Sequence, residues 1–180
     1  MNNIIFPKSS ERFVLKVPKD ILITELSKEI DFEGKTQIFY DKTDKNFRGQ
    51  LKGEKFLIKL NTTYRNSFKP TIRLTIRETE EKTEIILEYS LEPIVKGLMI
   101  FFIVVFAIIQ VLIIFFKFND LINDFKIDYL FPSLMIIALL FLSRMGFYMS
   151  QGHSESIIKK VLIKTRNKYY KQNRRNEQTN

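Results

Sequence analysis

Few side chains in this 180-residue chain could carry catalysis or bind a metal, and they are scattered. There is no cysteine and a single histidine, His153, so the chain offers neither a thiolate nucleophile nor several zinc ligands at set spacing. Carboxylates cluster at Asp41 with Asp44 and again over 78–81, in polar stretches where solvated loop charge is the expected role. Glycine-rich phosphate loops and nucleophile elbows are absent from the sequence. We therefore expect a protein that is not an enzyme and that uses no cofactor or metal.

One polar stretch has more features than a simple linker, namely Tyr64-Arg65-Asn66-Ser67-Phe68-Lys69-Pro70. In the simpler interpretation, Asn66 and Ser67 make a turn and the two aromatic residues cover the end of a sheet. In the functional one, Arg65 and Lys69 touch lipid phosphates or a partner, with the aromatic rings at headgroup level. The candidate contact residues are Tyr64, Arg65, Asn66, Ser67 and Phe68, together with Lys159, Lys160 and Lys164 near the C-terminus.

The element that must position these residues is the 20-residue run 97–116, whose only polar side chain is Gln110. At 1.5 Å per residue the run spans about 30 Å, the thickness of the hydrocarbon core of a bilayer. A soluble helix would need a polar face, and this run has none. The sequence predicts a transmembrane helix within 94–116.

A second apolar stretch, 129–149, is long enough to return across the membrane. Pro132 falls in its first turn, and Arg144 lies about one turn from its end, where the side chain can reach the interface. A re-entrant or interfacial helix is the alternative. The short loop 117–128 between the two stretches is predicted to be external.

The distribution of basic residues predicts how the two spans are oriented across the membrane. The tail from Ser150 onward carries eight lysines and arginines against two acidic residues, whereas residues 1–92 are nearly balanced. Because basic segments flanking a span stay in the cytoplasm, we expect an inner-membrane, multi-pass protein with both termini cytoplasmic. Within the tail, 150–180, an amphipathic helix is predicted over 154–170 with Ser154 as its N-cap. This helix either lies on the anionic inner leaflet or packs on the N-terminal domain; nucleic-acid binding is not expected.

Residues 1–92 have the pattern of a small α+β domain, mostly an antiparallel sheet with one helix. A strand is predicted over Arg12–Val17, followed by a helix that opens at Lys19 or Asp20 and ends at Gly34. Short strands are predicted over 37–40 and 47–51, and alternating patterns follow in three further segments, around 55–60, 72–77 and 84–91.

The last two strands pair in a single register. A hairpin turning at Glu80-Glu81 sets opposite charges and matching apolar side chains against each other, whereas a one-residue slip would mix them. The predicted pairs are Arg77 with Glu84, Arg73 with Glu88, Ile76 with Ile85, Leu74 with Leu87 and Ile72 with Tyr89.

The order of motifs resembles a group of small bacterial membrane proteins with two hydrophobic spans. The likeness rests on Phe47-x-Gly49, Phe56-x-Ile58 and the motif Tyr-Arg-Asn-Ser-Phe-x-Pro at 64–70, followed by two spans and a basic helix. Residues 60–62 and Leu74 depart from the pattern, which has basic and apolar residues at the first site and glycine at the second. The resemblance implies a cytosolic β-domain on a two-helix hairpin and implies no activity.

Three functions are consistent with this organisation. The first is a non-enzymatic module that recruits, senses or assists at the cytosolic face, with lipid, a membrane protein or a second copy of the chain as partner; Gln110 offers a contact between copies. The second is a lipid or apolar-ligand binder with a cavity lined by Phe47, Phe56, Ile58, Ile72, Leu74 and Tyr89. The third is an oligomeric pore or membrane-perturbing effector.

Overall fold

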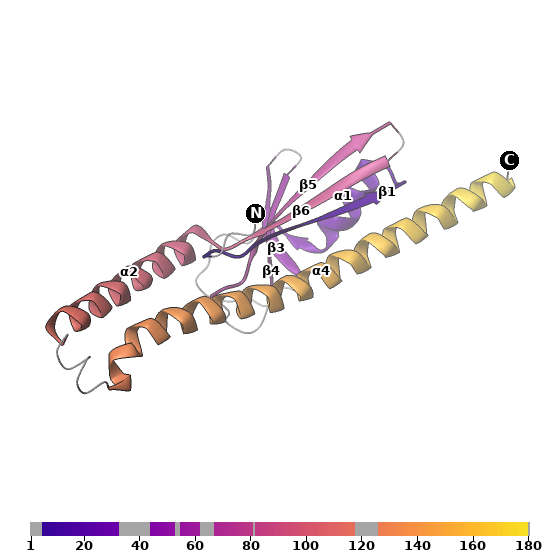
Figure 1. The fold of residues 1–180 in the computed structure, drawn as a ribbon. Helices are drawn as coiled ribbons and strands as arrows, with labels where there is room; N and C mark the ends of the chain where they lie inside the picture. Colours follow the sequence, from indigo (N-terminus) through magenta and orange to yellow (C-terminus); the bar gives the residue numbers. More distant parts are fainter. Residues whose placement is uncertain are drawn as a thin grey trace.

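The computed structural model describes residues 5–32, 44–52, 55–61, 67–80, 82–117 and 126–179. In chain order the elements are β1 (Lys8–Leu15), α1 (Lys19–Lys28), β2 (Ile30–Asp31), β3 (Phe47–Lys52), β4 (Lys55–Leu60), β5 (Thr71–Thr79), β6 (Lys82–Ser90), α2 (Pro93–Phe116), the 3-10 helix η1 (Ile127–Leu130) and α4 (Phe131–Thr179). The predicted α+β class is confirmed. Figure 1 shows the sheet at one end of α2, with α4 running past both.

The six strands form one sheet in the order β1-β6-β5-β4-β3-β2. Neighbouring strands are antiparallel except for β2 and β3, which are parallel, so the sheet is mixed. The first strand runs over Lys8–Leu15 rather than the predicted Arg12–Val17. Its bounds follow from its partner, because it pairs with β6 from Lys8 opposite Ser90 to Leu15 opposite Thr83.

The predicted register of the β5–β6 hairpin is confirmed at all five positions. The structure pairs Ile72 with Tyr89, Arg73 with Glu88, Leu74 with Leu87, Ile76 with Ile85 and Arg77 with Glu84. The apolar members of these pairs are all buried on one face of the sheet, which we call the inner face. The charged members lie on the opposite, outer face, as strand alternation requires.

Helices α1 and α4 cover the inner face, and Leu22 and Leu26 of α1 join the strand residues in one hydrophobic core. Helix α1 starts directly after Pro18, as predicted, but ends at Lys28 rather than at Gly34. It ends there because β2 begins at Ile30, whose buried side chain enters the core. Gly34 and the strand predicted over 37–40 lie outside the described residues.

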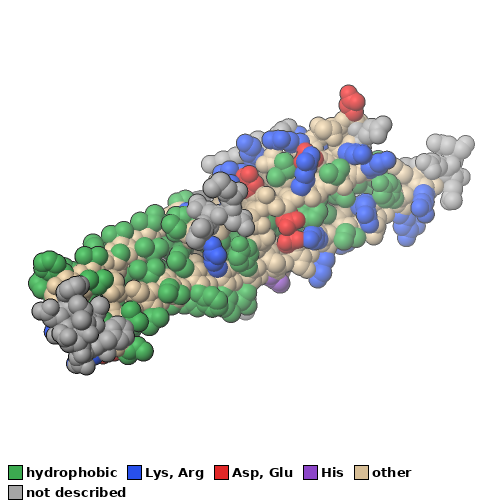
Figure 2. Space-filling model, viewed as in Figure 1, with side chains coloured by type: hydrophobic (Ala, Val, Ile, Leu, Met, Phe, Trp, Pro, Cys, Tyr) green, Lys and Arg blue, Asp and Glu red, His purple; other side chains and the backbone are tan. Residues whose placement is uncertain are grey.

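Helices α2 and α4 are both long and apolar enough to cross a membrane. They lie side by side where they leave the sheet, and hydrophobic side chains cover this end of the molecule while charged ones cover the other (Figures 1 and 2). Near the far end of the pair, Gln110 donates a hydrogen bond to the Tyr129 carbonyl (3.1 Å) and accepts one from the Ser133 hydroxyl (2.9 Å). The amide predicted to offer a contact between copies is thus used within one chain.

Helix α4 is a single 49-residue helix. The amphipathic segment predicted to start at Ser154 is therefore part of a longer helix, and no helix begins at Ser154. The Ser154 hydroxyl is inside the helix and donates to the carbonyl of Ser150 (2.8 Å) instead of capping an N-terminus. Beyond the apolar part, α4 packs on the inner face through Ile158 and Leu162, which are buried in the core. Packing of the tail on the domain, one of the two expected arrangements, is what the fold adopts.

The β3–β4 contact leaves no room for a side chain at Gly49. A methyl group there would lie 2.3 Å from the Leu57 carbonyl oxygen and 2.7 Å from Cγ2 of Ile58, its partner across the strands. We expect Gly49→Ala to lower the free energy of unfolding by about 1–3 kcal/mol, because the backbone must move apart. Thermal unfolding of the purified protein in detergent measures this loss.

Gly152→Ala is the matched control, because a methyl group there meets no atom within 4 Å. Alanine favours a helix over glycine by about 1 kcal/mol, so this variant should be as stable as the natural chain or more so. A melting temperature for Gly49→Ala equal to that of the natural chain would contradict the close approach of β3 and β4.

Candidate functional site at the junction of the sheet and the apolar helices

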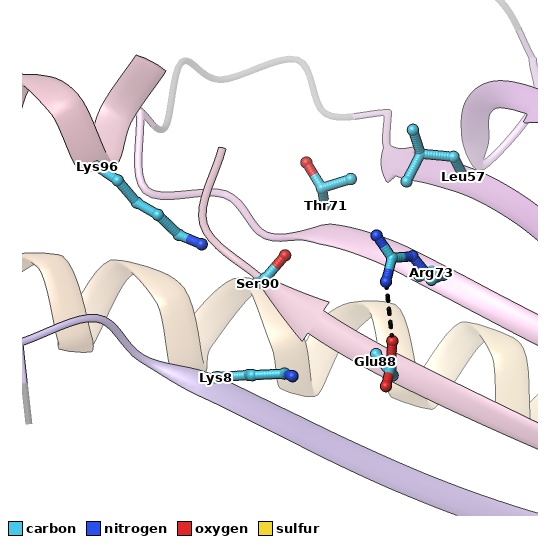
Figure 3. Close-up of a pocket in the computed structure, with 7 residues that line it drawn as sticks. All are labelled: Lys8, Leu57, Thr71, Arg73, Glu88, Ser90 and Lys96. Carbon is cyan, nitrogen blue, oxygen red and sulfur yellow. Dashed lines mark hydrogen bonds and ion pairs between the residues drawn. The ribbon is translucent and has the colours of Figure 1, made fainter. Parts of the chain in front are cut away.

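At the end of the sheet next to α2, four strands present one row of polar side chains on the outer face. Strand pairing aligns Lys59 with Thr71, Thr71 with Ser90, and Ser90 with Lys8. Strands lie about 4.8 Å apart, so the row is about 14 Å long. Together with Lys96 in the first turn of α2, three members of this row and their neighbours line a cleft of about 230 Å³ (Figure 3). Its lining residues are Lys8, Leu57, Thr71, Arg73, Glu88, Ser90 and Lys96.

Cations outnumber anions in this cleft. The Arg73 guanidinium lies 3.4 Å from the Glu88 carboxylate, so these two charges offset each other. Neither Lys8 nor Lys96 has an acidic partner in the lining, and in Figure 3 the Lys96 ammonium points toward Ser90. Beside the cleft, Lys59 is paired with Glu92, the residue that precedes α2. The arrangement can bind an anion through two lysines and the Ser90 hydroxyl.

The hydroxyl of Thr71 is buried and has no hydrogen-bond partner among the described residues. A buried hydroxyl that lacks a partner is costly, by about 1–3 kcal/mol, so such groups are often completed by water or a ligand. Thr71 is also one of the residues that line the cleft.

The motif at 64–70 adjoins this end of the sheet, but Tyr64, Arg65 and Asn66 lie outside the described residues. Ser67 is exposed, and Phe68 packs against the hydrophobic core. Lys69 donates to the Leu60 carbonyl (3.0 Å), and burial lowers the pKa of its ammonium, with Lys59 and Arg48 lowering it further. Lys69 therefore stabilises the neighbouring strand end, and contact of 64–68 with lipid or a partner stays a prediction.

The three candidate lysines of the tail differ in their surroundings. Lys159 forms an ion pair with Glu155, which raises the pKa of the lysine, and its ammonium lies 5.5 Å from the centre of the Phe13 ring. Lys160 and Lys164 are exposed. Along the straight axis of α4 they lie about 17 and 22 Å beyond Met149, the last residue of the predicted second span. The structure thus brings none of the three to the cleft.

Where α4 passes β1, the core contains polar groups. The Gln151 amide donates to the Ser9 hydroxyl (2.9 Å), which ties the exit of the apolar segment to the start of β1. Tyr89, opposite Ser9 in the sheet, is fully buried; its hydroxyl has no partner in the described part of the chain. Burial, with Glu155 and Glu11 nearby, raises the pKa of the Tyr89 phenol well above its usual value, so this group stays neutral.

Of the residues that could have carried catalysis, Asp41 and Glu81 lie outside the described residues, and the described ones are exposed. His153 is exposed on α4, and Asp44 and Glu78 are exposed in the domain. Within the described residues, no group of three histidine or acidic side chains is placed to hold a metal ion.

Sequence reasoning missed the two lysines of the cleft, Lys8 and Lys96. The two lysines are far apart in the sequence and come together because β1 pairs with β6. Local sequence patterns do not predict this long-range pairing. One signal was available, since the predicted hairpin register already sets Thr71 opposite Ser90.

No family model matches the chain, and no curated protein or solved structure matches it either. Function is therefore inferred from geometry and charge.

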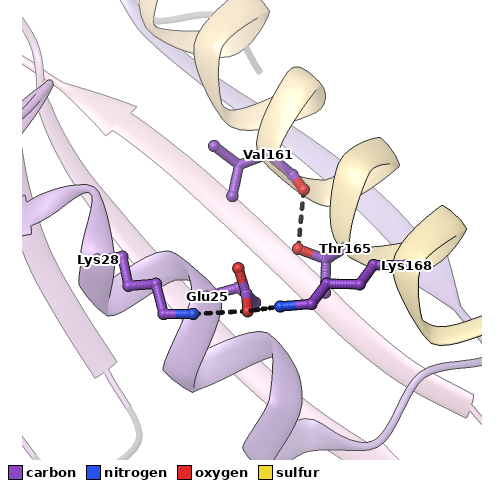
Figure 4. Close-up of polar contacts among 5 residues, drawn as sticks. All are labelled: Glu25, Lys28, Val161, Thr165 and Lys168. Carbon is purple, nitrogen blue, oxygen red and sulfur yellow. Dashed lines mark hydrogen bonds and ion pairs between the residues drawn. The ribbon is translucent and has the colours of Figure 1, made fainter. Parts of the chain in front are cut away.

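At the other end of the domain, one carboxylate joins the two helices that cover the sheet. Glu25 of α1 lies 2.7 Å from the Lys28 ammonium and 3.0 Å from the Lys168 ammonium of α4 (Figure 4). The hydrogen bonds from Lys28 and Lys168 lower the pKa of Glu25. Because the folded-state pKa is lowered, the pairing stabilises the fold above the ordinary carboxyl pKa and is lost as the pH falls through the lowered value.

We expect Glu25→Gln to lower the stability at pH 7 by up to about 1 kcal/mol, because the ammonium groups are largely exposed. The difference between the variant and the natural chain should shrink in acid below pH 4 and vanish once Glu25 is protonated. Melting curves of both proteins in one detergent across this range test it. Glu78→Gln, a change of the same kind at an exposed site, should have little effect at either pH; a gap between Glu25→Gln and the natural chain that persists in acid would contradict the ion pair.

Proposed function

We propose that this chain is an integral inner-membrane protein with both termini in the cytoplasm, and that it is a non-enzymatic module that recruits or senses a partner at the cytosolic face. The observation that carries the proposal is the continuity of α4. One helix contains the second apolar segment and then covers the inner face of the sheet, so the domain is held in a fixed orientation to the membrane.

Exposed apolar surface supports the membrane part. Many large apolar side chains on α2 and on the first half of α4 are exposed, including Phe115 and Phe116, which are 77% and 74% exposed. Soluble monomers rarely expose a contiguous apolar surface of this extent, and lipid would cover it. The eight basic residues after Ser150 support a cytoplasmic tail, which brings the domain to the same side.

The outer face of the sheet supports the recruiting part. It carries paired charges, such as Arg12 with Glu84 and Arg73 with Glu88, around the half-buried Ile86. In the described residues, the two covering helices lie on the inner face only, so the outer face is available to a partner. A mixed surface with an apolar centre and a polar rim has the composition of ordinary protein interfaces.

The other two functions find less support. The six side chains proposed to line a ligand cavity are each at most 2% exposed and pack in the core with α1 and α4. A pore would need polar groups along the helices, and Gln110 and Ser133 already bond to each other within the hairpin. We therefore do not favour a ligand binder or a pore.

Because the chain has no cysteine, each introduced cysteine is the only thiol and reports the side on which it lies. We expect Lys126→Cys, in the loop region, to react with a membrane-impermeant maleimide in intact cells. Arg77→Cys on β5 and Lys164→Cys on α4 should react only after the membrane is opened, because all three sites are exposed on the protein. The reverse pattern would place the domain outside, and labelling of all three in intact cells would refute anchoring by two spans.

Recruitment by the outer face is tested with a photoreactive amino acid in cells. The probe at Thr75, on the outer face opposite Ile86, should give discrete adducts with a protein partner. The same probe at Thr24, exposed on α1 over the inner face, is the matched control and should give none. Adducts of the same kind from both positions, or from neither, would contradict a recruiting role for this face.

A further inference from the structure

We infer that the cleft at the junction binds the phosphate of an anionic phospholipid headgroup from the leaflet on the side of the domain. The cleft combines Lys8 of β1, Arg73 of β5 and Lys96 of α2 with the hydroxyl residues Thr71 and Ser90 (Figure 3). Phosphate is recognised in proteins by this set of charged and hydroxyl donors.

The depth of the cleft relative to the membrane favours a lipid. Lys96 immediately precedes the apolar run 97–116, which spans about the hydrocarbon thickness. Its ammonium therefore lies at headgroup level, and the row Lys8–Ser90–Thr71 lies beside it. This step rests on the membrane anchoring proposed above, but not on which side of the membrane the domain occupies.

The balance of charge favours an anionic headgroup over a zwitterionic one. Glu88 is offset by Arg73, and Glu92 by Lys59, so Lys8 and Lys96 leave an excess of two positive charges. A choline or ethanolamine headgroup would bring a cation of its own into this field, whereas a glycerol headgroup brings only hydroxyls. Thr71, whose hydroxyl lacks a partner among the described residues, belongs to the lining beside these charges.

The test uses the full-length protein in detergent, titrated with phosphatidylglycerol or phosphatidylcholine and read by native mass spectrometry. We expect phosphatidylglycerol to bind more tightly. Each of Lys8→Ala and Lys96→Ala should weaken its binding about fivefold, and the double variant about twenty-fivefold. Lys96→Arg should keep the affinity, which guards against a loss caused by misfolding.

Lys55→Ala is the matched control, since Lys55 is an exposed lysine on the same strand as Leu57 but is not part of the cleft. It should change the affinity less than twofold. An equal loss for Lys55→Ala would overturn the site in favour of general attraction between a basic protein and anionic lipid. Displacement of the lipid by equimolar glycerol 3-phosphate would overturn the lipid assignment in favour of a soluble phosphate.

The result of the lipid titration can be distinguished from the result of the cysteine-labelling experiment. Lipid selectivity that depends on Lys8 and Lys96 supports the site whichever face the cysteines report. Its absence refutes the site and leaves the anchoring unaffected.

Discussion

The fold depends on one face of α4, which packs first against α2 and then, further along the helix, against the sheet. Along α4, the buried positions Phe147, Ile158 and Leu162 continue one stripe from the apolar segment onto the sheet. Small hydroxyl residues fill the stripe between and beside them, and each bonds to its own helix: Ser143 to Leu140, Ser154 to Ser150 and Thr165 to Val161. Because these hydroxyls are satisfied by carbonyls three or four residues back, they are buried without needing a partner from the sheet. The helix can therefore pack against α2 and the sheet through small polar residues and few large ones.

Attachments on two sides, one at α2 and the other at α4, fix the domain relative to these helices. Only Leu91 and Glu92 separate β6 from α2, and Leu91 and Met99 are both buried in the core cluster that contains Phe147. On the other side, Gln151 bonds to Ser9, and the Glu25–Lys168 ion pair joins α1 to the distal part of α4. Rotation of the sheet about either helix would expose the core, so the cleft keeps its place next to the first turn of α2. The lipid site that we propose depends on this fixed position, because the depth of the cleft decides which groups it can reach.

The sequence predicted those features of the fold that depend on residues close together in the chain. The β5–β6 register followed from alternating charges and apolar residues on adjacent strands, and the apolar run 97–116 followed from composition alone. The continuity of α4 did not, because Ser150, Gly152 and Ser154 together have the composition of a helix boundary. That boundary is overridden by tertiary packing: Ser150 and Ser154 face the core, and Gly152, on the exposed side, costs only about 1 kcal/mol relative to alanine. The cleft was out of reach for a related reason, since Lys8 joins it only through the pairing of the first and last strands.

Because α4 is one continuous helix, the basic residues fall into two groups at different places in the structure. Composition alone does not distinguish these two groups. Lys8 and Lys96 lie where the apolar helices meet the sheet, whereas Lys160 and Lys164 lie on the part of α4 that packs on the domain. The screening length at physiological salt is about 8 Å. In the membrane arrangement proposed above, the tail lysines lie about 17 to 22 Å beyond the second apolar stretch, two or more screening lengths from the headgroups. On that proposal the lysines of the cleft are nearer to the headgroups than Lys160 and Lys164 are, and the tail lysines stay candidates for contact with a partner.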